Sequence, residues 1–202
     1  MDIPGPIAAL LACGLPGIAG IALGEKLIPV VPSYVLYVFL GMSAVPSGGD
    51  LAATILAATL GSSLGALAWY GLGRALGERR TEAAVERWGR WVFLPPQRYR
   101  HLAGLYRRNH FIATLLGQVT PVVRIYMPIP AGVLGLALAP FTLAIVLGNL
   151  AWDAALLGIG YALRGSGGDP LKAGLAVVAG LLLTETLAVL ALRWRARKRR
   201  PA

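Results

Sequence analysis

A single arginine, Arg124, stands in the middle of an apolar and proline-rich stretch of the chain. Pro121 precedes it by three residues, Pro128 follows it by four, and the stretch reaches Gly132 soon afterwards. A guanidinium group presents a fixed fork of hydrogen-bond donors that fits two oxygens of a phosphate or a carboxylate. We therefore expect Arg124 to bind an anionic group, in a segment that begins at Pro121 and ends at Gly132.

Two carboxylates stand in comparable surroundings. Glu25 directly precedes a first proline-rich stretch, and Asp153 lies inside a long apolar run. Acidic side chains at such positions are functional candidates, with proton transfer as one chemistry they supply. The structural alternatives are that Glu25 is a solvated loop residue, that Asp153 pairs with Gln118, or that either acid pairs with Arg124 and locks two parts of the protein together.

Motifs of enzymes and metal sites are weak in this chain. Residues 61–65 match Gly-x-Ser-x-Gly, but a nucleophile elbow needs a preceding strand and a histidine partner. Ala57, Gly61 and Gly65 recur at a spacing of four, which favours close helix packing instead. No His, Cys and carboxylate cluster has metal-ligand spacing. We expect no catalytic residues, no metal and no cofactor.

The elements that position these residues are predicted to be membrane helices. Hydrophobic residues make up 56% of the 202 and charged residues only 14%, with a mean hydropathy of +0.66. Apolar blocks at 3–23, 51–73, 133–163 and 171–192 approach the roughly 20 residues that a spanning helix needs. The only charge before the first apolar block is Asp2, so we expect a retained helix rather than a signal peptide. The sequence predicts an all-α polytopic membrane protein.

Basic residues are concentrated in two places. Residues 74–108 hold nine arginines and residues 193–200 hold six Lys or Arg, which together make 15 of the 19 in the chain. Because Lys and Arg favour the cytoplasmic flank of a membrane protein, the linker at 78–108 and the tail at 193–202 are both predicted to be cytoplasmic. Anionic lipids are the expected partners of this charge. Nucleic acid is disfavoured because the basic residues flank apolar spans.

The linker also shows helical periodicity. Val85, Trp88 and Val92 recur at helical spacing before the Pro95-Pro96 pair, and apolar residues do so again after it. The pattern predicts two short amphipathic helices on the membrane surface.

Two proline-rich stretches, at 24–50 and 110–137, are predicted to be re-entrant hairpins. Each contains a Pro-Val-Val tripeptide, and each must begin and end on one side if the linker and the tail are both cytoplasmic. The chain then repeats one order, a re-entrant hairpin followed by a transmembrane helix, with opposite orientations, between N- and C-terminal transmembrane helices. Inverted repeats with broken segments are a transporter architecture, and the hairpin tips, which include Tyr34, become the candidate site. The alternative is that paired prolines recur by chance.

Many spaced positions resemble the DedA family of VTT-domain membrane proteins, over roughly residues 20 to 165. In the first half the matching positions are Glu25, Pro32, Gly41, Gly61, Gly65, Tyr70, Gly73, Arg74 and Gly77. In the second half they are Pro121, Arg124, Ala131, Gly132, Phe141, Gly148, Trp152, Gly160 and Tyr161. The resemblance implies a transporter that moves undecaprenyl phosphate or phospholipids between leaflets.

The chain departs from the family pattern at several ionisable positions. Tyr34 and Ala66 stand where the family usually has acidic residues, Gln118 stands where it usually has an arginine, and Leu136 replaces the usual methionine. The lost ionisable groups are those that the family associates with proton coupling or substrate handling. We therefore expect transport to depend only weakly on a proton gradient unless Asp153 or Glu25 carries the proton.

The expected function is a membrane lipid transporter or scramblase of the DedA type, in a bacterial inner membrane, built as a single membrane domain over 1–202. The alternative is a non-transporting scaffold or envelope-homeostasis protein that has lost the site. A homo-oligomer is compatible with the sequence. The candidate substrate-binding residues are Arg124, Glu25, Asp153, Gln118, Tyr34, Pro121 and Gly132.

Overall fold

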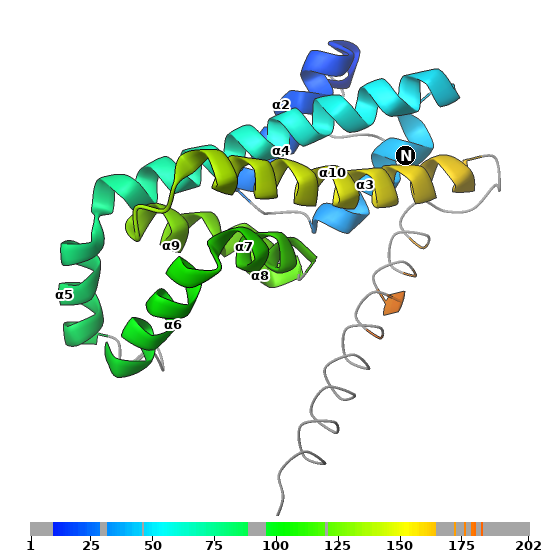
Figure 1. Cartoon of the computed structure of the whole chain (residues 1–202). Helices are drawn as coiled ribbons and strands as arrows, with labels where there is room; N and C mark the ends of the chain where they lie inside the picture. The colour runs from blue at the N-terminus through cyan, green and yellow to red at the C-terminus, as the bar shows by residue number, and fades with distance from the viewer. Residues whose placement is uncertain are drawn as a thin grey trace, which may run out of the picture. The chain divides into compact units, whose positions relative to one another are not determined.

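The structure of the chain is a computed structural model (Figure 1). It describes residues 10–28, 32–45, 47–88, 96–119 and 121–164, together with residues 172, 176, 179, 180 and 183. Within these residues the regular elements are all α-helices, so the prediction of an all-α protein is confirmed. The helices are α2 (Leu15–Leu27), α3 (Ser33–Ser43), α4 (Gly48–Leu76), α5 (Glu78–Trp88), α6 (Pro96–Arg108), α7 (His110–Val119), α8 (Pro121–Tyr126), α9 (Pro128–Val133) and α10 (Leu138–Leu163).

Two of these helices, α4 with 29 residues and α10 with 26, are long and apolar enough to cross a membrane. They correspond to the blocks predicted at 51–73 and 133–163, although α10 begins only at Leu138 because residues 128–133 form the separate helix α9. Of the block at 3–23, the structure describes the part from residue 10 onward. The block at 171–192, apart from isolated positions, and the tail at 193–202 lie outside the described residues.

The chain divides into two compact units. The first comprises Met1–Val30 and Ala52–Ala154, and the second comprises Val31–Leu51 and Ala155–Ala202. The first unit therefore holds α2, α5 to α9 and most of α4 and α10. The second holds α3 and the remaining ends of α4 and α10.

Prolines divide the stretch at 110–137 into short helices. Pro121 begins α8 and Pro128 begins α9. Proline is favoured at the first turn of a helix, where its missing N–H needs no partner, and it is excluded from a helix interior. Gly135, with φ 62, makes the turn before α10, a conformation that glycine adopts without a steric cost. The stretch is thus a series of α7, α8 and α9 rather than one spanning helix (Figure 1).

Glycines let α2 approach α4 closely in the first unit. A Cβ atom added at Gly61 would overlap the backbone of Ala19, and one added at Gly65 would lie 2.7 Å from the Lys26 Cβ. Bulkier residues would separate the two helices. The prediction of a small-residue packing stripe at Ala57, Gly61 and Gly65 is confirmed for the two glycines.

The linker forms helices α5 and α6, so its predicted helices are confirmed up to Trp88 and from Pro96 onward, whereas Val92 lies outside the described residues. α5 and α6 are joined by exposed ion pairs, Arg100 with Glu86 at 3.0 Å and Arg107 with Glu78. Exposed pairs contribute only about 0–1 kcal/mol each, so they align the two helices more than they stabilise them. Residues 89–95, between α5 and α6, lie outside the described residues.

The second unit is built on a glycine contact between α3 and the end of α10. A Cβ added at Gly41 would lie 3.0 Å from the Gly160 Cα, and one added at Gly160 would lie 3.0 Å from the Gly41 Cα. Arg164 donates a hydrogen bond to the Val45 carbonyl (2.9 Å) and lies over the Tyr161 ring. These contacts hold the two helix segments together.

Candidate functional site

Polar side chains on α4 and α10 meet inside the first unit. Thr59 and Ser63 lie one turn apart on α4, and Asn149 and Asp153 lie one turn apart on α10, so each pair shares one face of its helix. The Thr59 hydroxyl donates to the Asp153 carboxylate over 3.3 Å, and the Asn149 amide donates to the Ser63 hydroxyl over 3.2 Å. All four side chains are buried. Two long apolar helices are thus joined by a buried polar contact.

Two cations converge on the Asn149 side chain. Its amide oxygen accepts one hydrogen bond from the Lys26 ammonium group over 3.5 Å and another from the Arg124 guanidinium over 3.3 Å. Lys26 and Arg124 are each only 1% exposed. Lys26 comes from α2 and Arg124 from α8, so the amide of α10 joins three helices. We call Lys26 and Arg124 the cation pair, and the Asn149 side chain its bridging amide.

Aromatic residues contact both basic residues of the cluster. The Arg124 guanidinium carbon lies 4.5 Å from the centre of the Trp152 ring, a cation–π distance. The Trp69 indole donates to the main-chain carbonyl of Lys26 over 3.0 Å, which ties the end of α2 to α4. Trp152 of α10 thus contacts the charged group of Arg124, whereas Trp69 of α4 anchors the main chain at Lys26.

Two carboxylates accompany the cations. Glu25 is 7% exposed and Asp153 is fully buried, and Lys26 and Asp153 both lie within the electrostatic influence of Glu25 and Arg124. Charges in an apolar interior interact strongly because little water screens them. The site therefore combines two basic and two acidic groups, and a change of charge at one of them affects the others.

Gln118 lies beside this cluster. It is 1% exposed and packs against Gly148, next to Asn149, because a Cβ added at Gly148 would overlap the Gln118 Cβ and Cγ. Within the described part of the chain, neither amide atom of Gln118 has a hydrogen-bond partner. A buried polar group without a partner costs about 1–3 kcal/mol, and in native proteins water or a ligand usually satisfies it. The alternative in which Asp153 pairs with Gln118 is therefore not seen among the described residues, where the Asp153 carboxylate accepts from Thr59.

Gly132, Pro121 and Tyr34 complete the predicted site residues. Gly132 is a packing residue of α9, because a Cβ there would overlap the Tyr70 carbonyl of α4. Pro121 opens α8 and so sets the start of the segment that carries Arg124. Tyr34 is half-buried on α3 and belongs to the second unit. Of the predicted set, the structure brings together Arg124, Glu25, Asp153 and Gln118.

The sequence prediction missed Lys26 and Asn149. In the sequence, Lys26 is only one of four basic residues outside the two basic regions. Asn149 is uncharged, so it does not stand out in an apolar run. A usable signal was present, since Asn149 precedes Asp153 by four residues and therefore shares its helix face. Within the described residues, no group of three or more His, Cys, Asp or Glu side chains is placed to hold a metal ion.

Comparisons with known proteins agree on one family. The VTT domain model matches residues 31–162. The chain is 28% identical over 144 residues to undecaprenyl phosphate transporter A of Staphylococcus aureus, covering 71% of each protein. It is 30% identical over 177 residues to an alkaline phosphatase-like protein of Lactococcus lactis subsp. cremoris, covering 87% of this chain and 79% of the relative.

A further relative carries a location in its name. The chain is 31% identical over 133 residues to the inner membrane protein YqjA of Escherichia coli, covering 66% of this chain and 58% of the relative. No solved structure matches the chain. Together with the two apolar helices α4 and α10, this relative indicates a membrane location. The chain belongs to the VTT-domain family of membrane proteins, the DedA family.

Proposed function

We propose that this protein moves an anionic lipid, either undecaprenyl phosphate or a phospholipid, between the leaflets of a bacterial inner membrane. The observation that carries the proposal is the cation pair of Lys26 and Arg124 on one bridging amide. The amide oxygen of Asn149 has no net charge, and it accepts one hydrogen bond from each cation. A phosphate oxygen is a stronger acceptor for the same donors, because charge-assisted hydrogen bonds are the stronger class.

The position of the cluster supports transport rather than surface binding. Charged side chains are costly inside a membrane protein, and where they occur they usually line the path of a substrate or an ion. The hydrocarbon tail of a lipid can stay in the bilayer during transfer, whereas its headgroup needs polar contacts. The buried polar faces of α4 and α10 supply such contacts, and Gln118 adds an amide with no protein partner in the described residues. The S. aureus relative is named as a transporter of a lipid phosphate.

The proposal includes the topology expected from the sequence. We take the stretches at 24–50 and 110–137 as re-entrant hairpins of an inverted repeat, with the linker at 78–108 and the tail at 193–202 in the cytoplasm. The division of 110–137 into α7, α8 and α9 supports this, since broken helices of this kind occur at membrane depth where they are buried in protein or line a cavity. Alternate exposure of the cluster to the two sides then moves the lipid headgroup.

Leaflet exchange in liposomes tests the proposal. Purified protein is reconstituted with a trace of fluorescent phosphatidylglycerol, and the label in the outer leaflet is quenched chemically. Protein-containing liposomes should lose the fluorescence of both leaflets, whereas empty liposomes keep that of the inner leaflet. A parallel assay follows the accessibility of undecaprenyl phosphate from outside. Folded protein that exchanges neither lipid contradicts the proposal and favours the non-transporting scaffold.

A further inference from the structure

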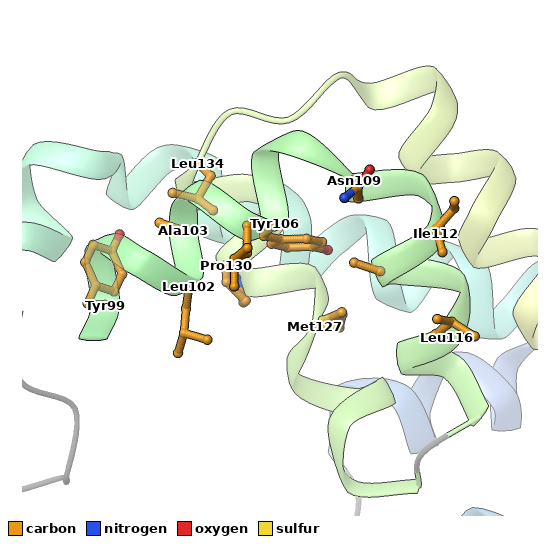
Figure 2. A pocket seen from close by; sticks show the side chains of 12 residues that line it. Tyr99, Leu102, Ala103, Tyr106, Asn109, Ile112, Leu116, Met127, Pro130 and Leu134 are labelled. Carbon is orange, nitrogen blue, oxygen red and sulfur yellow. The ribbon is translucent and has the colours of Figure 1, made fainter. Parts of the chain in front are cut away.

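An apolar groove of about 610 Å³ lies on the first unit, lined by α6, α7 and α9 (Figure 2). Its lining side chains extend from Tyr99 at one end, past Tyr106, to Ile112 and Leu116 at the other, with Met127 between them. None of the residues around Asn149 is among its lining residues. Most of the lining comes from two consecutive helices of the chain, α6 and α7.

Helix α7 stands between the groove and the polar cluster. Ile112 and Leu116 lie one turn apart and line the groove, with 57% and 64% of their surfaces exposed. Thr114 and Gln118 also lie one turn apart but on the buried side of the helix, at 0% and 1% exposure. The groove is thus an outer surface of the molecule, and a ligand in it would not contact the cation pair through α7.

The chemistry of the groove suits a hydrocarbon chain. The lining is almost entirely aliphatic and aromatic. The Tyr106 hydroxyl is already hydrogen-bonded to the Thr114 hydroxyl at 2.9 Å, and burial raises the pKa of Tyr106, so this group stays neutral and adds no charge to the groove. A polar ligand would find few hydrogen-bond partners there, whereas an extended apolar chain would bury its length against the wall.

One helix that lines the groove, α6, is basic. It carries four arginines, of which Arg100 and Arg107 pair with glutamates of α5. Basic segments beside a membrane attract anionic headgroups, and tyrosines such as Tyr99 and Tyr106 favour the boundary between hydrocarbon and water. A basic lining helix therefore favours a lipid with an anionic headgroup over one without net charge.

We propose that this groove binds one hydrocarbon chain of an anionic membrane lipid, at a site distinct from the cluster around Asn149. The proposal goes beyond transport, because it does not require the lipid in the groove to be the one that is moved. The α4 side chains of Leu56, Leu60 and Leu64, which are 58–64% exposed, form an apolar row outside the groove. We expect the lipid to bind in the groove more tightly than along this row.

Photochemical labelling tests this site. The full-length protein is reconstituted into phosphatidylcholine liposomes that contain phosphatidylglycerol with a photoreactive group on one acyl chain, and labelled residues are mapped by mass spectrometry. Groove residues such as Leu102, Ile112 and Leu116 should be labelled several-fold more than Leu60 of the α4 row. Unlabelled phosphatidylglycerol should compete for this excess, and phosphatidylcholine should not. Equal labelling of both surfaces, or equal competition by both lipids, overturns the proposal.

Matched variants locate the lipid. Ala113→Trp should fill the groove and remove the excess labelling, whereas Ala151→Trp places the same bulk on an exposed position of α10 and should leave it unchanged. Folded Ala113→Trp protein with full excess labelling contradicts the proposal. The competition measurement uses the unmodified protein and holds even if Ala113→Trp fails to fold. Arg124→Ala should keep the labelling, so loss of transport and loss of the groove site are distinguishable.

Discussion

The Arg124 guanidinium donates to the Asn149 amide oxygen over 3.3 Å, and the same oxygen accepts from Lys26. A neutral group therefore holds two like charges together in an interior with little water. Glu25 and Asp153 both act electrostatically on Lys26, and Asp153 also interacts with Arg124, so these acids offset part of the repulsion. An anion that binds both cations would relieve this repulsion directly.

Replacing the bridging amide by a carboxylate should lower lipid transfer without destabilising the folded protein. Asn149→Asp keeps the size of the side chain and places a negative charge between Lys26 and Arg124. We expect folded protein whose thermal stability is equal or higher, because the new carboxylate adds an ionic interaction with both cations. Lipid transfer should fall about tenfold or more, the effect of about 1.4 kcal/mol, since the lipid phosphate must now displace a carboxylate. Lipid transfer that is undiminished in Asn149→Asp liposomes would show that the cations are not the headgroup site.

The two buried acids should carry whatever proton dependence exists. The double substitution Glu25→Gln and Asp153→Asn removes both ionisable acids of the cluster while keeping their size. We expect the dependence of lipid transfer on an imposed proton gradient to disappear, because no acid of the cluster can then bind and release a proton. The measurement compares transfer rates with and without the gradient in the same liposome preparation. Gradient dependence that survives the double change places the proton carrier elsewhere.

Close packing of α9 on α4 should make Gly132 intolerant of a side chain. Gly132→Ala would force a Cβ against the Tyr70 carbonyl and should destabilise the folded protein by about 1–3 kcal/mol. Gly71→Ala on α4 is the matched control, because nothing lies within 4 Å of a Cβ at Gly71. That control should be neutral or stabilising by about 0.5–1 kcal/mol, since alanine is the better helix former. Thermal unfolding in detergent measures both, and equal melting temperatures would contradict the close contact.

Single cysteines should report the proposed topology. In a background without Cys13, cysteines at Arg80 and Arg197 should react with a membrane-impermeant reagent only from the cytoplasmic side. A cysteine at Gly167 should react only from the other side. Labelling is measured in inside-out vesicles, which expose the cytoplasmic face, and in right-side-out vesicles, which expose the other face. Labelling of positions 80 and 197 from opposite faces contradicts the inverted repeat with two re-entrant hairpins.

Local patterns in the sequence predict the helices but not their pairing. Prolines at 121 and 128 predict the breaks between α7, α8 and α9, and long apolar runs predict α4 and most of α10. Arg124 and Asp153 are recognisable because a charge stands out in an apolar run. The bridging role of Asn149 is not recognisable in this way, since its contact with Lys26 joins residues 123 positions apart.

The repeated tripeptide does not by itself predict which side chains Tyr34 contacts. The repeated Pro-Val-Val tripeptide places Tyr34 at the tip of a hairpin equivalent to the one that carries Arg124. In the structure Tyr34 is half-buried on α3, in the second unit, and its place in the site stays a prediction. A repeated tripeptide predicts similar local backbone, but tertiary packing decides which side chains meet. Lys26, on the helix before that tripeptide, is the residue that reaches the cluster.

The most direct test of the central claim measures lipid transfer per folded protein in Arg124 variants. Arg124→Lys keeps the charge but loses the fork that holds two phosphate oxygens, so the protein should fold and lose much of its transfer. Arg124→Ala should lose nearly all transfer, while Lys172→Ala, which removes an exposed basic side chain, should lose none. A purely structural Arg124 would instead leave a buried carboxylate unpaired in the alanine variant, at a cost of about 3–5 kcal/mol, and little folded protein would be recovered. Well-folded Arg124→Ala protein with undiminished lipid transfer would contradict the claim that Arg124 binds the headgroup.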